Sequence, residues 1–147
     1  MRTARLLLGV SALILATGSA AHALAFKHAL AALATVKLSA GMAGAFKALW
    51  LADSTTCLTI AAIFALVAVR PSKIAGQLAM LIALIPAFTG IFIYEFLGNF
   101  YAGHLMIIAA ASAFIAGLLL WQPLLLDLHK HGVFGVDHLD DRSPRVL

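Results

Sequence analysis

Charged residues are scarce in this chain of 147 residues. They make up 11% of it, against about a quarter in soluble domains, whereas hydrophobic residues make up 63%. A water-soluble surface cannot be built from so few charges, so the composition excludes a soluble nucleotide-binding domain. It also excludes a disordered tail, which would be poor in apolar residues. The chain is therefore predicted to be a membrane protein.

Cysteine and clustered basic residues are nearly absent as well. Cys57 is the only cysteine, which excludes an internal disulfide, a secreted disulfide scaffold and a CxxC redox or zinc motif. The net charge is +4, but lysine and arginine stand singly at the ends of apolar runs, where they face lipid headgroups. We therefore expect no nucleic-acid partner. The sequence also has no Gly-rich phosphate loop and no nucleophile elbow.

Four long apolar runs dominate what is present. About 20 helical residues cross the ~30 Å hydrocarbon core of a bilayer, so each run is predicted to span the membrane. The predicted fold is all-α, an antiparallel four-helix transmembrane bundle over residues 1–123 with a cytoplasmic tail over residues 124–147. The predicted spans are residues 6–25, 49–69, 74–97 and 101–120.

The first run allows a second interpretation. Ala21-His22-Ala23 is a plausible signal-peptidase site after an apolar stretch. A retained span is favoured, because the stretch is long for a signal. The connection that follows is predicted to be an external interfacial helix over residues 26–38, since its leucines fall on one helical face. A flexible stretch over residues 39–44 is expected after it.

The loop charges predict the orientation. With the amino terminus inside, the cytoplasmic side holds seven basic residues and the opposite side holds three. The positive-inside rule then favours both termini in the cytoplasm and a bacterial inner-membrane location. The seven are Arg2, Arg5, Arg70, Lys73, Lys130, Arg142 and Arg145, and the three are Lys27, Lys37 and Lys47.

Ionisable residues within the spans gather at one depth. They are costly in a membrane, about 2.5–3.5 kcal/mol each at mid-helix, and are often functional. The predicted topology places all of them near the external face, with His28 just beyond. The four within the spans are His22, Asp53, Glu95 and His104.

This polar layer has several interpretations. Imidazole and carboxylate groups together suit a divalent metal, and the same groups could relay protons or bind a quinone headgroup. The alternative is structural: Asp53 or Glu95 pairs with Lys47 or a histidine and sets the helix register, or extends into the headgroup region. Depth alone does not choose between these interpretations.

The fourth span carries small residues at intervals of four, namely Ala109, Ala113 and Gly117. Such a face lets another helix approach closely. The approaching helix belongs either to the same bundle or to another subunit.

Four features of the second half of the chain form a pattern: Asp53 opens the second span, Pro86 lies in the third, Glu95 follows it and His104 opens the fourth. In this pattern, residues 45–120 resemble the DoxX-like group of small four-helix bacterial membrane proteins. The amino-terminal half departs from that pattern. The resemblance implies a membrane protein of a group sometimes associated with quinone-linked sulfur oxidation, and it identifies no catalytic residue.

These observations favour a small accessory subunit of a larger inner-membrane assembly. Its expected partners are the lipid bilayer and either other membrane subunits or further copies of the chain. The leading alternative is a membrane-embedded redox protein or enzyme that binds a metal or quinone through the polar layer. An oligomeric small transporter is the third interpretation.

Overall fold

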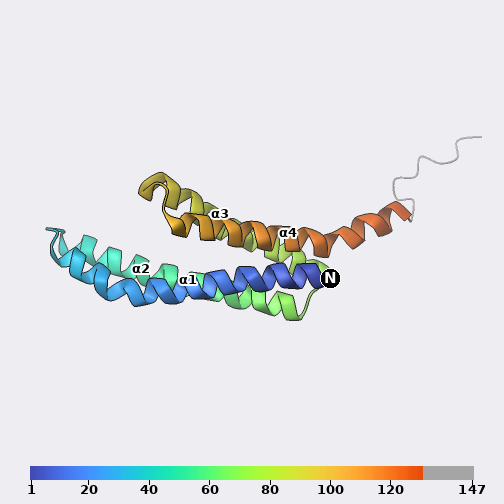
Figure 1. Cartoon of the computed structure of the whole chain (residues 1–147), viewed down its shortest axis with the longest axis horizontal. Coiled ribbons are helices and arrows are strands. Elements are labelled where there is room, and N and C mark those ends of the chain that lie inside the picture. The colour runs from blue at the N-terminus through green and yellow to red at the C-terminus, as the bar shows by residue number, and fades with distance from the viewer. Residues whose placement is uncertain (131–147) are drawn as a thin grey trace, which may run out of the picture.

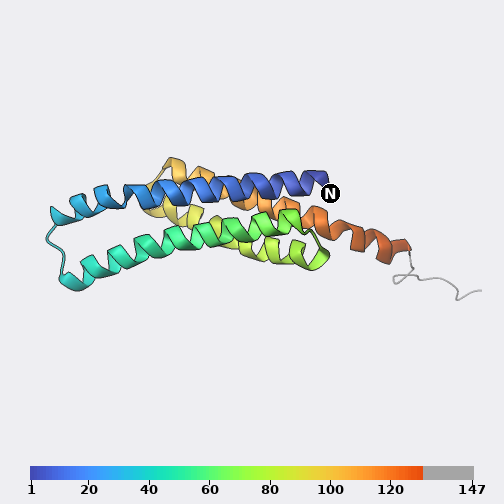
Figure 2. The same cartoon turned by 90° about the horizontal axis from the view of Figure 1, so that it is seen from below.

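The computed structural model describes the backbone of residues 1–130 and side chains as far as Gln122, and this part of the chain is built entirely of helices and turns. The helices are α1 (Arg2–Ala34), α2 (Ala40–Val69), α3 (Lys73–Leu97) and α4 (Tyr101–Lys130). Figures 1 and 2 show each helix reversing the direction of the one before it. The helices therefore form two hairpins, α1–α2 and α3–α4, and the all-α prediction is confirmed.

All four helices are long and apolar enough to cross a membrane. The segment of α4 with this character is Tyr101–Gln122. Large apolar side chains such as Leu13, Leu81 and Phe92 point outward from the bundle. An apolar exterior is what a lipid environment requires, and these features together indicate a multi-pass membrane protein.

The helix ends follow from local sequence signals. Ser39 caps α2 by accepting a hydrogen bond from the Met42 amide at 3.3 Å, and Ser72 caps α3 by accepting one from the Ala75 amide at 3.1 Å. Gly98 ends α3 with a φ of 69°, a backbone conformation that glycine adopts without strain. These caps allow short turns between consecutive helices.

The first connection differs from the prediction of a separate interfacial helix over residues 26–38. Residues up to Ala34 continue α1 without a break, because the stretch after Ala25 holds no glycine or proline and is rich in alanine. Residues 40–44 of the expected flexible stretch over residues 39–44 are also helical, since Ser39 caps α2 there. At the other end, α4 continues to Lys130. Residues 131–147 of the predicted tail lie outside the described part of the chain.

Packing joins the two hairpins mainly through α1 and α4. The helices within each hairpin are in extensive contact, α1 also packs along α4, and α2 and α3 touch only slightly. The largest fully buried apolar side chains are Leu8, Leu15 and Phe64, and much of the remaining core is alanine. Small core residues allow the helix backbones to approach closely.

The small-residue face of α4 packs inside the chain. Ala109 and Ala113 are fully buried. A Cβ atom added to Gly117 would lie 2.6 Å from the carbonyl oxygen of Gly76 and against the side chain of Met80. The helix that approaches this face is therefore from the same chain, and the face is not open to another subunit.

Two serine hydrogen bonds set the relative depth of the helices. The Ser11 hydroxyl donates to the carbonyl of Ala109 at 2.7 Å, and the Ser19 hydroxyl donates to the carbonyl of Ser54 at 2.6 Å. Tyr101 precedes Ala109 by eight residues, or about 12 Å. Because α1 and α4 run in opposite directions, the start of α4 lies level with Ser19 and Ser54.

It follows that the α1–α2 hairpin is longer than its neighbour. The turn between α3 and α4 lies near the level of Ser19 and His22, while α1 continues to Ala34. Figures 1 and 2 both show the α1–α2 turn extending well beyond the α3–α4 turn. We call this end of the molecule the distal end, and residues 23–49 the distal hairpin. Its α1 arm is about 18 Å long.

Candidate functional site

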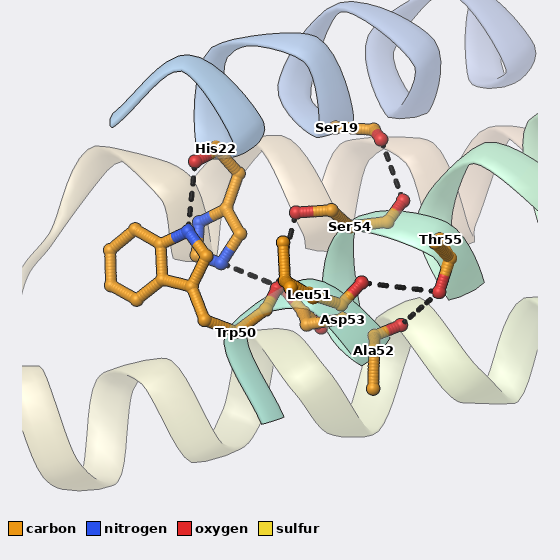
Figure 3. A network of polar contacts seen from close by, with 8 residues as sticks. All are labelled: Ser19, His22, Trp50, Leu51, Ala52, Asp53, Ser54 and Thr55. Carbon is orange, nitrogen blue, oxygen red and sulfur yellow. Dashed lines mark hydrogen bonds and ion pairs between the residues drawn. The ribbon is translucent and has the colours of Figure 1, made fainter. Parts of the chain in front are cut away.

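The best-organised polar cluster lies at the base of the distal hairpin (Figure 3). The rings of His22, from α1, and Trp50, from α2, stack with centroids 4.1 Å apart and planes within 9°. The Trp50 Nε1 group donates a hydrogen bond to the His22 carbonyl at 2.9 Å. His22 Nε2 also lies 3.6 Å from Asp53 Oδ2. One histidine thus connects α1 to α2 through its ring and its backbone.

Serines continue this connection toward the centre of the bundle. Ser19 and Ser54 are both buried, and the Ser19 hydroxyl bonds to the Ser54 carbonyl. The Ser54 hydroxyl bonds in turn to the carbonyl of Trp50 at 3.2 Å. The hydroxyl of Thr55 donates within its own helix. All three hydroxyls have a hydrogen-bond acceptor, but only that of Ser19 joins the two helices and holds them in register.

Two phenylalanines extend the cluster away from the bundle. The rings of Phe26 and Phe46 lie with centroids 6.5 Å and 5.5 Å from that of Trp50. Aromatic pairs at these separations contribute about 0.5–1.5 kcal/mol each beyond the area they bury. We call His22, Phe26, Phe46 and Trp50 the aromatic clasp. It fixes where the distal hairpin leaves the bundle.

The other predicted polar residues lie on the second hairpin. His104 meets Tyr94 edge to face with ring centroids 5.4 Å apart, and its Nδ1 lies 3.4 Å from the Phe100 carbonyl. Glu95 is exposed. Among the described residues, His22 and Asp53 form the one ion pair within 4.0 Å, so Glu95 is not part of one. His28 is exposed on the distal hairpin. The predicted layer is thus divided between two places.

The structure does not assemble these residues into a metal centre. Within the described part of the chain, no group of three or more His, Cys, Asp or Glu side chains is placed to hold a metal ion. The physical reason is helix rotation: residues at one depth can face different directions, and Glu95 and His104 are exposed on their own hairpin. Asp53 and His22 are close to each other, but they are 45% and 34% exposed.

Two cavities of the bundle lie away from the predicted ionisable residues. One of about 290 Å³ opens between α2 and α3, where the two helices touch only slightly, and is lined by threonines and isoleucines. Another of about 330 Å³ lies between α3 and α4, and its lining is apolar. Neither cavity is lined by His22, Asp53, Glu95 or His104. The first cavity therefore offers threonine hydroxyls and apolar groups, the second only apolar groups, and neither is lined by an acid or a histidine.

Comparisons with protein-family models, with curated proteins and with solved structures find no match. The resemblance of residues 45–120 to DoxX-like proteins therefore stays a prediction. The functional interpretation rests on the geometry of the chain itself.

Three residues of this region had no predicted role in joining the helices. They are Trp50, Ser11 and Ser19, none of which the sequence marks as a contact between helices. A serine within an apolar run is a weak signal of a hydrogen bond between helices, because its hydroxyl must find a partner in the membrane. The sequence does not tell which helix supplies that partner.

We expect Trp50→Ala to loosen the base of the distal hairpin. The change removes a ring stack, two further aromatic contacts and a hydrogen bond between helices. Amide hydrogen exchange of residues 23–49 should rise about tenfold, which corresponds to about 1.4 kcal/mol, while α3 and α4 keep their protection. Trp50→Phe keeps a ring but loses the hydrogen bond, and should give an intermediate rise. Unchanged exchange in Trp50→Ala would show that the clasp does not hold the hairpin.

Proposed function

We propose that this protein is a small integral accessory subunit of a larger membrane assembly. In this proposal the antiparallel bundle spans a bacterial inner membrane with both termini in the cytoplasm, and the distal end faces outward. The exposed apolar surface of the distal hairpin is the main observation that supports the proposal.

The surface of the distal hairpin supports a role in assembly. No residue between Ala23 and Leu49 is buried in the single chain. Several of its large apolar side chains near the tip are exposed, with Val36 at 56%, Leu38 at 37% and Met42 at 60%. Each such side chain gains about 1.5–3 kcal/mol when it is fully buried. A contact with another protein would supply that burial.

The length of the hairpin supports a position of this surface outside the bilayer. Tyr101 and Trp121 are twenty residues apart on α4, or about 30 Å, which matches the hydrocarbon thickness. The base of the hairpin lies at the level of Tyr101. Each headgroup layer is about 5–8 Å thick, whereas the α1 arm extends about 18 Å. Most of the exposed apolar surface near the tip would then face water or a partner.

The placement of the polar residues also favours assembly over an enclosed reaction site. His22 and Asp53 join two helices at the bundle surface, and Glu95 and His104 are exposed. Groups in this arrangement suit helix register and surface recognition. The resemblance to DoxX-like proteins implies a membrane protein of a group sometimes associated with quinone-linked sulfur oxidation, and it identifies no reaction site among these residues.

Native electrophoresis of membranes dissolved in a mild detergent tests this proposal. We expect the tagged chain to migrate in a discrete assembly that contains a second protein at constant stoichiometry. Leu81→Ala, on the lipid-facing side of α3, should leave the assembly intact and serves as a control for a substitution outside the distal hairpin. If the chain migrates alone, or only with further copies of itself, both in this detergent and after cross-linking in intact cells, the accessory-subunit proposal is wrong.

A further inference from the structure

We infer that the distal hairpin is a docking element for an acidic protein surface. This inference rests on the proposed function and names the chemistry of the partner. It follows from the charge, the exposed side chains and the geometry of residues 23–49.

The charge of the hairpin is of one sign. Residues 23–49 contain Lys27, Lys37, Lys47 and His28 but no aspartate or glutamate. All four side chains are exposed. The nearest acid along the chain is Asp53, which lies beside His22 below the hairpin. The lysines therefore have no acid within the hairpin to neutralise them, and an acidic surface complements them.

Exposed apolar side chains lie beside the outermost cation of the hairpin. Lys27 and Lys47 lie a few residues above the base on the two arms, and Lys37 lies in the turn. Val36 and Leu38 flank Lys37, Met42 lies in the first turn of α2, and all three apolar side chains are exposed. Apolar side chains next to charged ones are the usual composition of a protein interface.

Two other occupants fit the hairpin less well. The bilayer that holds the bundle is a poor one, because the arms continue the axes of α1 and α2 away from it (Figure 2). A second copy of the chain is also poor, since two hairpins with the same charge would repel each other when their tips meet. An acidic protein satisfies both the charge and the apolar surface.

The hairpin is also held ready for binding. The aromatic clasp fixes its base, and the Ser39 cap starts α2 directly after the turn. A preformed surface loses less conformational entropy when it binds than a mobile loop does.

Site-specific photo-cross-linking in intact cells tests the inference. The photoreactive residue p-benzoylphenylalanine replaces Met42 in the full chain, and mass spectrometry identifies the attached peptide. We expect one protein, joined through a segment rich in aspartate and glutamate. The same residue at Leu81, on the lipid-facing side of α3, is the positional control and should attach to lipid.

Charge substitutions make the test specific. The triple variant Lys27→Glu, Lys37→Glu, Lys47→Glu should lower the cross-linking yield at Met42 by about tenfold or more, because attraction becomes repulsion. The matched triple arginine variant should stay within about twofold of the original chain, since it keeps the charge. All three positions are exposed, so we expect the two variants to have equal thermal unfolding midpoints. Equal midpoints would show that the lower cross-linking yield does not come from unfolding.

Several results would overturn the inference. They are attachment to lipid alone, attachment to a second copy, attachment through a segment without acidic residues, and a yield that does not change on charge reversal. Native electrophoresis separates this failure from that of the proposed function. If the assembly persists when the charges are reversed, the accessory role stands and the acidic docking surface is wrong. If the original chain migrates alone, the proposed function itself fails.

Discussion

Gly117→Leu is expected to destabilise this protein more than any other single change on α4. The backbones of α3 and α4 meet at Gly117, where an added Cβ would lie 2.6 Å from the Gly76 carbonyl oxygen and against Met80. Backbone cannot move aside as a flexible side chain can, so the two helices must separate. Overpacking of this kind costs about 1–3 kcal/mol and sometimes more. Thermal unfolding of the purified protein in detergent, followed by circular dichroism, measures the loss.

The matched control is the same substitution at Gly18. An added Cβ at that position would meet no atom within 4 Å, so Gly18→Leu should leave the unfolding midpoint unchanged or raise it slightly. A rise is plausible on physical grounds because leucine has a higher helix propensity than glycine, by up to about 1 kcal/mol. Equal midpoints for Gly117→Leu and Gly18→Leu would contradict the close approach of α3 and α4.

Ser11→Leu is expected to separate the two hairpins. Ser11 is fully buried where α1 meets α4, and its hydroxyl bonds to the Ala109 carbonyl at 2.7 Å. This seam carries most of the contact between the hairpins, since α2 and α3 touch only slightly. A leucine there both removes the hydrogen bond and overfills the seam. We expect a loss of about 2 kcal/mol or more in the free energy of unfolding.

Two further variants show whether the lost hydrogen bond or the added volume causes the destabilisation. Ser11→Ala removes the hydrogen bond without adding volume, and should cost about 0.6 kcal/mol, the typical value for such a bond between membrane helices. Thr17→Leu enlarges an exposed residue of the same helix whose hydroxyl bonds only within α1, and should be nearly neutral. If Ser11→Leu matched Thr17→Leu in unfolding free energy, the α1–α4 seam would not be what joins the hairpins.

Helix α1 takes part in both the α1–α4 seam and the aromatic clasp. Ser11 lies in the seam, and His22 contributes to the clasp. Helix α1 therefore connects the bundle core to the distal hairpin as one continuous element. A partner bound at the hairpin would be anchored to the membrane bundle through α1. Variants of the seam should weaken the assembly only by unfolding the bundle, whereas lysine variants should weaken it with the bundle intact.

The sequence by itself determined the membrane class, the all-helical fold and the existence of four spans. Each of these follows from composition and from the length of the apolar runs, which are properties of single segments. The third helix is predicted over residues 74–97 and observed over Lys73–Leu97, because Ser72 and Gly98 mark its two ends. The common depth predicted for His22, Asp53, Glu95 and His104 likewise follows from the position of each residue along its predicted span.

Only the tertiary structure decided which of these residues meet. Depth follows from residue number, but contact also depends on how each helix is rotated and which helices are neighbours. That rotation is set by packing across the bundle, here by Ser11 against Ala109 and by Gly117 against Gly76. Packing brings His22 to Asp53 and places His104 against Tyr94 instead. It also encloses the small face of α4 within the chain and leaves the distal hairpin without cover, because no helix of the second hairpin is long enough at that end to reach it.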